Sequence, residues 1–267
     1  MSANSVEPWF KIVSRPLYEK TVQFLESGYL YGMDEAAAHN AAETGASVIF
    51  SSWLVSLFLI GLALIARGSF GSILKKEGHK KYYAKNTFSI LVLFEVYVEF
   101  IRNLSDSLVG RKNTKQFFWL FGGLFIYIVT NNLLGLLPGA VSPSQSISNN
   151  LAIATVVLVF FTVIGFARQG VGFLKHMMGP VWYMAPLIFV IELFSTFIVR
   201  PGSLSLRLAG NMNGDHAVLG VTYQFAEYVL PTIALCLGTF VSFVQAFVFT
   251  LLTIIYVVFS LEHDDQH

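Results

Sequence analysis

The side chains best suited to chemistry interrupt one long apolar stretch of the sequence, between positions 182 and 226. They are Glu192, Arg200, Arg207, Asp215 and His216. Arg207 is the most demanding, because arginine keeps its proton in proteins and costs at least about 2.5–3.5 kcal/mol at the depth of a bilayer. Such a charge predicts a partner or an aqueous cavity beside it, and hence a functional role. The alternative, a side chain that snorkels to the interface, suits Arg200 better, since Pro201 adjoins it.

Helical spacing groups the neighbours of Arg207. Ser203 and Asn211 lie four residues to either side of it, so all three share one helix face. His216 follows by nine residues, which at about 100° per residue is roughly the opposite side. Histidine changes charge near neutral pH, so we expect a proton path that approaches Arg207 from another face. For His216 and Gln245, a hydrogen-bonded packing role is the alternative.

Glu192 precedes Arg207 by fifteen residues, roughly 22 Å along a straight helix, which is too far for a direct ion pair. A carboxyl group in lipid is protonated or hydrated. Glu192 therefore suggests a second wet region, nearer the cytoplasm. The alternative is an interfacial carboxylate near a helix end.

The composition is that of a membrane protein. Of 267 residues, 55% are hydrophobic and only 12% are charged, about half the charged share of a soluble domain. The net charge of +1 offers a nucleic-acid partner no electrostatic support. The single cysteine, Cys236, excludes an intrachain disulfide and is interpreted as a small buried hydrophobe. We expect no metal and no cofactor, and the sequence contains no P-loop, GxGxxG, HExxH or GxSxG motif.

Charge-free segments predict the membrane helices. Residues 46–66, 116–137 and 150–167 are each long enough to span, and residues 182–226 and 228–261 are longer than a span requires. The basic residues of 67–85 and the group at 168–176 indicate cytoplasmic loops. We therefore expect an outward-facing polar tail (1–45), a membrane domain (46–262) and a cytoplasmic tail (263–267).

One predicted helix differs from these spans. Within residues 87–109, Glu95, Glu99, Arg102 and Asp106 share one face, as in an amphipathic helix lying at the cytoplasmic surface. A further spanning helix is the alternative, but it would take four charges across lipid. The expected fold is thus an all-α integral membrane protein with about five membrane helices and one interfacial helix. The last two membrane helices are long and form a strongly tilted hairpin, turning near 227–231.

Four motifs, in the same order, resemble subunit a of the F-type ATP synthase. They are Asn-Leu-Leu-Gly-Leu-Leu-Pro (132–138), Ser-Pro-Ser-Gln-Ser-Ile-Ser-Asn-Asn-Leu-Ala (142–152), Leu-Arg-Leu-Ala-Gly-Asn-Met (206–212) followed by His216, and Gln-Ala-Phe-Val-Phe-Thr-Leu-Leu (245–252). The resemblance implies a proton-translocating stator subunit with two offset half-channels, present in one copy per complex. It implies a rotor c-ring, a b-subunit peripheral stalk and membrane lipid as partners, and ATP chemistry on other subunits.

The resemblance also assigns roles by matching position. Arg207 matches the essential arginine that faces the rotor carboxylates. The other matched positions are Asn211 and Gln245 around that arginine, His216 and Asn132 in the outer half-channel, and Glu192 and Ser203 in or near the inner one.

The sequence departs from the family at Gly238, where members usually carry His or Glu seven residues before the glutamine. We hypothesise that Asp215 supplies the missing carboxylate; water in the space beside Gly238 is the alternative. The long N-terminal tail and the basic loop favour a bacterial inner membrane over a mitochondrial one.

Two other classes compete with this interpretation. A self-contained ion-coupled transporter predicts inverted repeats and broken helices around a central site, and we find neither pattern in the sequence. A structural membrane anchor does not require Arg207, Asp215 and His216 in one membrane segment.

Overall fold

The computed structural model describes residues 15–29, 35–74, 90–137, 140–170, 172, 183–225 and 229–261, and every regular element in this part of the chain is helical. The predicted all-α class is confirmed. The helices are α2 (Arg15–Tyr29), α3 (Glu35–Leu74), α4 (Ile90–Val109), α5 (Arg111–Gly135), α6 (Ile147–Gln169), α8 (Ala185–Phe194), α9 (Arg200–Phe225) and α10 (Val229–Leu261), with a 3-10 turn η2 (Pro143–Gln145) and a π-turn η3 (Ser195–Val199).

Five helical stretches are long and apolar enough to cross a bilayer, as predicted. They are Ala36–Gly68, Arg111–Gly135, Ile147–Arg168, Pro186–Phe225 and Val229–Leu261. The first begins upstream of the expected apolar run, because α3 starts at Glu35 with several alanines, which favour helix. The expected boundary at residue 45 therefore falls inside a continuous helix.

Two segments of the first 45 residues are helical, namely α2 and the beginning of α3. α2 packs against the beginning of α3 through Tyr18, Val22, Ala42 and Ala46, all of them buried. The hydroxyl of Tyr18 donates a hydrogen bond to the backbone oxygen of Glu43, at 3.1 Å. α2 is thus packed against α3, the first membrane helix.

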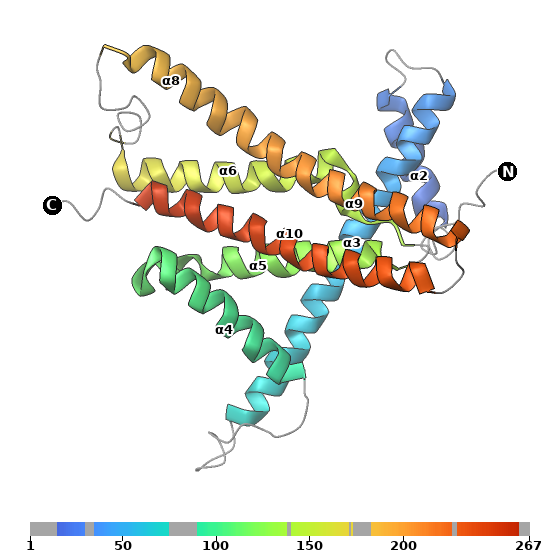
Figure 1. Cartoon of the computed structure of the whole chain (residues 1–267), viewed down its shortest axis with the longest axis horizontal. Helices are drawn as coiled ribbons and strands as arrows, with labels where there is room; N and C mark the ends of the chain where they lie inside the picture. Colours follow the sequence, from blue (N-terminus) through green and yellow to red (C-terminus); the bar gives the residue numbers. More distant parts are fainter. Residues whose placement is uncertain are drawn as a thin grey trace.

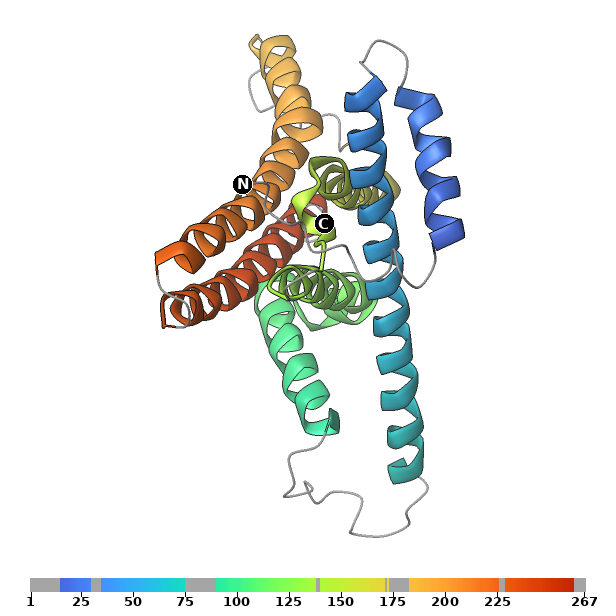
Figure 2. The same ribbon diagram turned by 90° about the vertical axis from the view of Figure 1, so that its right-hand side faces the viewer.

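The core of the bundle is formed by α5, α6, α9 and α10. Phe121 and Ile128 of α5 pack with Val157 of α6, Leu208 of α9 and Phe249 of α10, and all five are buried. α3 crosses this group steeply in Figure 1, and the view turned by 90° in Figure 2 agrees. If α3 follows the membrane normal, the other membrane helices are strongly inclined.

The last hairpin matches the predicted one. α8, η3 and α9 form one long rod that packs against α10, and the chain reverses between residues 225 and 229. α10 contains 33 residues, about 50 Å of helix, whereas the hydrocarbon core is about 30 Å thick. An inclined orientation absorbs the excess, although the tilt relative to the bilayer stays a prediction.

The amphipathic segment forms α4, which is not among the five spans. Glu95, Glu99 and Arg102 are exposed on its polar face. On its packed side, the hydroxyl of Tyr97 donates to the carbonyl of Gly122 in α5, and burial raises the pKa of this phenol. Gly110, with φ 82°, makes the sharp turn from α4 into α5, a conformation that favours glycine. The location of α4 at the cytoplasmic surface stays a prediction.

Gly135 lets α5 and α9 approach each other closely. A Cβ atom at this position would lie 1.7 Å from Cε of Met212 in α9 and 2.7 Å from Cβ of Ser142. The methionine end can move aside, but the Ser142 Cβ is fixed by its own backbone. The absence of a side chain at position 135 therefore allows the close approach to the middle of α9, where Met212 lies.

We predict that Gly135→Ala lowers the free energy of unfolding by about 1–3 kcal/mol, the usual cost of overpacking. The control is Gly123→Ala in the same helix, where an added Cβ meets nothing within 4 Å; it should be neutral or slightly stabilising. Thermal unfolding of the detergent-solubilised protein measures both. Equal unfolding midpoint temperatures for the two variants would show that Gly135 is not in close contact with Met212 and Ser142.

Candidate functional site

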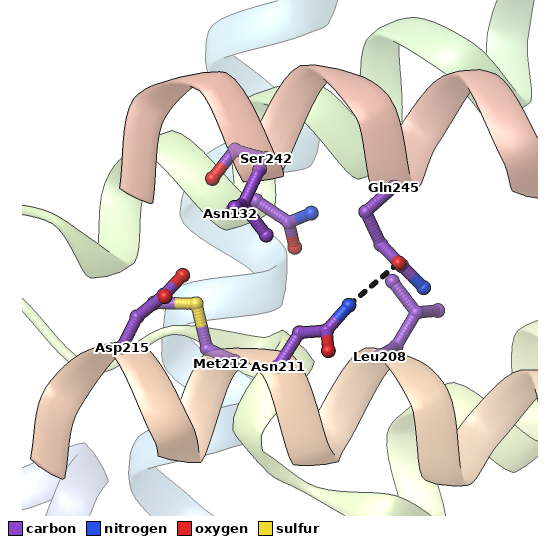
Figure 3. Close-up of a pocket in the computed structure, with 8 residues that line it drawn as sticks. Asn132, Leu208, Asn211, Met212, Asp215, Ser242 and Gln245 are labelled. Carbon is purple, nitrogen blue, oxygen red and sulfur yellow. Dashed lines mark hydrogen bonds between the residues drawn. The ribbon is translucent and has the colours of Figure 1, made fainter. Parts of the chain in front are cut away.

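A small polar cavity lies between α5, α9 and α10 (Figure 3). It is lined by Asn132, Leu208, Asn211, Met212, Asp215, Val241, Ser242 and Gln245. Its volume is about 10 Å³, which is room for about one water molecule. Four of the seven residues that the sequence predicted for the proton path meet here: Asn132, Asn211, Asp215 and Gln245.

A hydrogen bond joins the two long helices across this cavity. Nδ2 of Asn211 donates to Oε1 of Gln245 at 2.7 Å (Figure 3). Gln245 is buried, whereas Asn211 lies on the exposed side of α9. The two amides predicted to surround Arg207 are thus one connected pair, with Asn211 one helical turn from Arg207.

The carboxyl group of Asp215 lies next to Gly238 on the facing helix. A Cβ atom at position 238 would be 3.6 Å from Oδ2 of Asp215 and 2.9 Å from a methyl carbon of Leu136. The carboxyl of Asp215 therefore borders the space that a side chain at position 238 would enter. This geometry is compatible with the hypothesis that Asp215 takes over from an acidic group at that position.

Two buried atoms near this carboxyl have no hydrogen-bond partner among the described residues. One is Oδ1 of Asn132, which lines the cavity, and the other is Nε2 of His216, the next residue after Asp215. Buried polar atoms are nearly always paired, and a histidine nitrogen can either donate or accept a proton. Oδ1 of Asn132 can therefore accept a hydrogen bond, and Nε2 of His216 can donate or accept one, when a water molecule or another polar group comes within reach.

Arg207 does not line the cavity. Together with Ser203 and Asn211 it occupies one exposed face of α9, as the spacing predicted. Added Cβ atoms at Gly210 and Gly214 would meet nothing within 4 Å. Among the residues that the structure describes, Arg207 has no ion-pair partner. The face around Arg207 is therefore uncovered in this chain, and the two glycines leave room for another helix to pack closely.

Glu192 is paired with Arg200. Nη2 of Arg200 donates to Oε1 of Glu192 at 2.8 Å, and the hydroxyl of Thr196 lies 3.4 Å from the same oxygen. The guanidinium carbon of Arg200 is 5.1 Å from the ring centre of Tyr256 in α10, a cation–π distance. The prediction that Glu192 does not pair with Arg207 agrees with this geometry. The interpretation of Arg200 as a snorkelling side chain missed both of its partners.

The π-turn η3 explains why residues eight apart can meet. Eight residues of regular α-helix rotate by about 800°, which leaves the side chains about 80° apart. A π-turn accommodates one extra residue, so Glu192 and Arg200 are phased like residues seven apart, about 20° from alignment. Pro201 contributes to this break, because it lacks an N–H group and its ring crowds the preceding turn.

Sequence reasoning missed Ser242 and misjudged Cys236. Ser242 lies three residues before Gln245 and shares its helix face, a spacing that could have revealed it. Cys236 was interpreted as buried, but it is exposed. That interpretation was wrong because an apolar residue of a membrane helix can equally lie on its outer surface, as Phe240 of the same helix does with 66% exposure.

The fold and site define a multi-pass helical membrane protein with a polar cavity and an uncovered arginine in its last hairpin. The sequence model of the ATP synthase A chain family matches residues 49–258. ATP synthase subunit a of Bdellovibrio bacteriovorus is 38% identical over 212 residues, 79% of this chain and 90% of the relative. The subunits a of Geobacter sulfurreducens and Trichlorobacter lovleyi are 35% and 37% identical over 221 residues, 83% of this chain and 90% of each relative. The chain belongs to the ATP synthase A chain family, and its role is that of a membrane-sector (Fo) subunit of an F-type ATP synthase.

We predict that Asn211 and Gln245 are energetically coupled. In a double-mutant cycle of Asn211→Ala and Gln245→Ala, the coupling should be about 0.6 kcal/mol and at most about 1.7 kcal/mol, the range of such bonds between membrane helices. Equilibrium unfolding in mixed detergent micelles gives the four free energies. Additive single effects would mean that the bond does not join α9 to α10 in the membrane.

Proposed function

We propose that this chain is the proton-translocating stator subunit of its ATP synthase, with Arg207 facing the carboxylates of a rotor c-ring. The observation that carries the proposal is the exposed position of Arg207 without an ion pair among the described residues. The two carboxylates nearest to it along the hairpin are engaged elsewhere, because Glu192 pairs with Arg200 and Asp215 lines the cavity. The counter-charge of Arg207 then comes from a partner chain.

The physics of the exchange follows from the permanent charge of Arg207. A protonated ring carboxyl group travels through lipid cheaply, whereas an ionised one does not. When the group arrives opposite Arg207, the guanidinium favours its ionised form, and the proton leaves. The same charge repels a proton that would cross directly between the two half-channels. Each charge moved is worth about 2.3 kcal/mol per 100 mV, so such a leak would dissipate the gradient.

The outer half-channel, in this proposal, passes His216 and Asp215 and reaches the cavity beside Asn132. Asp215 and His216 are adjacent in sequence and both half-buried, so a proton can be handed between a carboxylate and an imidazole. Space for about one water molecule separates this carboxylate from the amide pair. The Asn211–Gln245 pair ends the path one turn from Arg207.

The inner half-channel uses Glu192, with Ser203 between it and Arg207. Arg200 holds the carboxylate of Glu192 at 2.8 Å, so we assign Arg200 as a positioning residue for this proton acceptor. Ser203 is exposed on the face of Arg207 and its hydroxyl donates to the carbonyl of Arg200. Ser203 is thus a polar group between Arg200 and Arg207 in the sequence of this helix.

The setting of the subunit is part of the proposal. We propose a bacterial inner membrane, with residues 1–45 outside, the membrane domain at 46–262 and residues 263–267 in the cytoplasm. Its partners are the c-ring, the b-subunit stalk and lipid, with one copy per complex and no ATP chemistry on this chain. The similar proteins named above are bacterial. Arg168 at the end of α6 donates to Gln116 near the start of α5 at 2.8 Å, which supports a common side for these two ends.

We predict that Arg207→Ala abolishes coupled ATP synthesis, because nothing then discharges the rotor carboxyl or blocks a direct leak. Arg207→Lys should also fail badly, since a desolvated lysine loses its charge. ATP synthesis driven by a proton gradient in membrane vesicles measures both. The control is Arg67→Ala, an exposed arginine near the end of α3. Normal synthesis by either Arg207 variant refutes the assigned role.

We predict that Asp215→Asn lowers ATP-driven proton pumping by at least about tenfold, since a positioned proton-transfer group is worth a factor of about 10²–10⁴. Adding Gly238→Glu should restore part of the activity, because the new carboxylate enters the same space from α10. Gly238→Ala alone, which adds no carboxylate, is the control for packing. Full pumping by the single Asp215 variant ends the hypothesis, and so does a folded double variant without any recovery.

A further inference from the structure

A second cavity lies at the corner between α4 and α5, at the opposite end of α5 from Asn132. It is lined by Arg102, Asp106, Arg111, Lys112, Thr114, Lys115 and Phe118. Its volume is about 520 Å³, in the range of pockets that hold small organic ligands. None of these residues belongs to the proton path.

The cavity carries an excess of positive charge. Arg102 pairs with Asp106, with Nε and Oδ2 3.7 Å apart. Arg111, Lys112 and Lys115 have no ion-pair partner among the residues that the structure describes. These three cations fall within the first five residues of α5, whose first turn contains no acidic residue. Like charges in such proximity repel one another, so an anion in the cavity would relieve the repulsion.

The order of residue types along α5 indicates what kind of anion fits. The cations at 111–115 come first, and Phe118 and Trp119 follow directly. Phe118 lines the cavity, and Trp119 is 63% exposed. Tryptophan is typical of the membrane–water interface, and α5 is one of the five candidate spans. A ligand in this cavity therefore has its charge at headgroup level and an apolar part beside the aromatic rings.

We propose that this cavity binds the phosphate headgroup of an anionic phospholipid, with the acyl chains beginning beside Phe118. Basic pockets at the ends of membrane helices are suited to such headgroups, because the lipid supplies the counter-charge. The proposal is independent of the proton path, so the failure of one leaves the other standing.

Native mass spectrometry of the full-length chain tests the proposal. The delipidated protein is titrated with phosphatidylglycerol and with phosphatidylcholine of the same acyl chains. The test variant is K112Q/K115Q, the conservative variant is K112R/K115R, and the charge-matched control is K20Q/R67Q, which removes two exposed cations outside the cavity. Circular dichroism and size-exclusion chromatography verify that each variant is folded.

We expect phosphatidylglycerol to be preferred by the unmodified chain, K112R/K115R and K20Q/R67Q. K112Q/K115Q should lose about 25-fold in affinity, since each lysine near an anionic headgroup is worth about fivefold. An equal loss in K20Q/R67Q, or no preference between the two lipids, overturns the proposal. Displacement of the lipid by equimolar inorganic phosphate or oligoglutamate also overturns it, since the cavity would then be a site for free anions or for an acidic protein segment.

Discussion

The arrangement of the last hairpin depends on one constraint. The guanidinium of Arg207 cannot lose its proton, and it lies on the uncovered face of a membrane helix. Arg207 is exposed in the chain by itself, and lipid is a costly environment for it. The two carboxylates in the described part of the hairpin do not neutralise it, because Glu192 is held by Arg200 and Asp215 faces the cavity. The subunit alone therefore lacks a counter-charge for Arg207. A rotating partner with its own carboxylates would supply that counter-charge.

The same hairpin keeps its two titratable regions apart. Glu192 precedes Arg207 by roughly 22 Å of helix, and Asp215 follows it by roughly 12 Å. α8, η3 and α9 form one continuous rod, so these separations are maintained by the rod itself. The tight approach at Gly135 and the Asn211–Gln245 bond hold this rod against α5 and α10. The proposed proton transfer requires such a rigid spacing, with the fixed charge of Arg207 between the two titratable regions.

Sequence alone predicted those features that depend on regular helix phase. The common face of Ser203, Arg207 and Asn211 followed from spacing by four, and the five spans followed from the charge-free segments. The Glu192–Arg200 pair could not be predicted, because the π-turn changes the phase between them, and Pro201 does not by itself indicate an extra residue in the preceding turn. The Asn211–Gln245 bond and the contact between Asp215 and Gly238 depend on how α9 packs on α10, which no local pattern fixes. Cys236 was misjudged because burial in protein and exposure to lipid favour the same residue types.

The most direct test is to ask which face of α9 touches the rotor in the assembled complex. In a background with Cys236→Ser, cysteines are placed at Gly210 and Gly214 on the uncovered face and at Met212 on the buried face. The rotor subunit carries one cysteine beside its membrane carboxylate. The account predicts disulfide cross-links from positions 210 and 214 and none from 212. Cross-links from position 212 only, or from none of the three in an assembled complex, would contradict it.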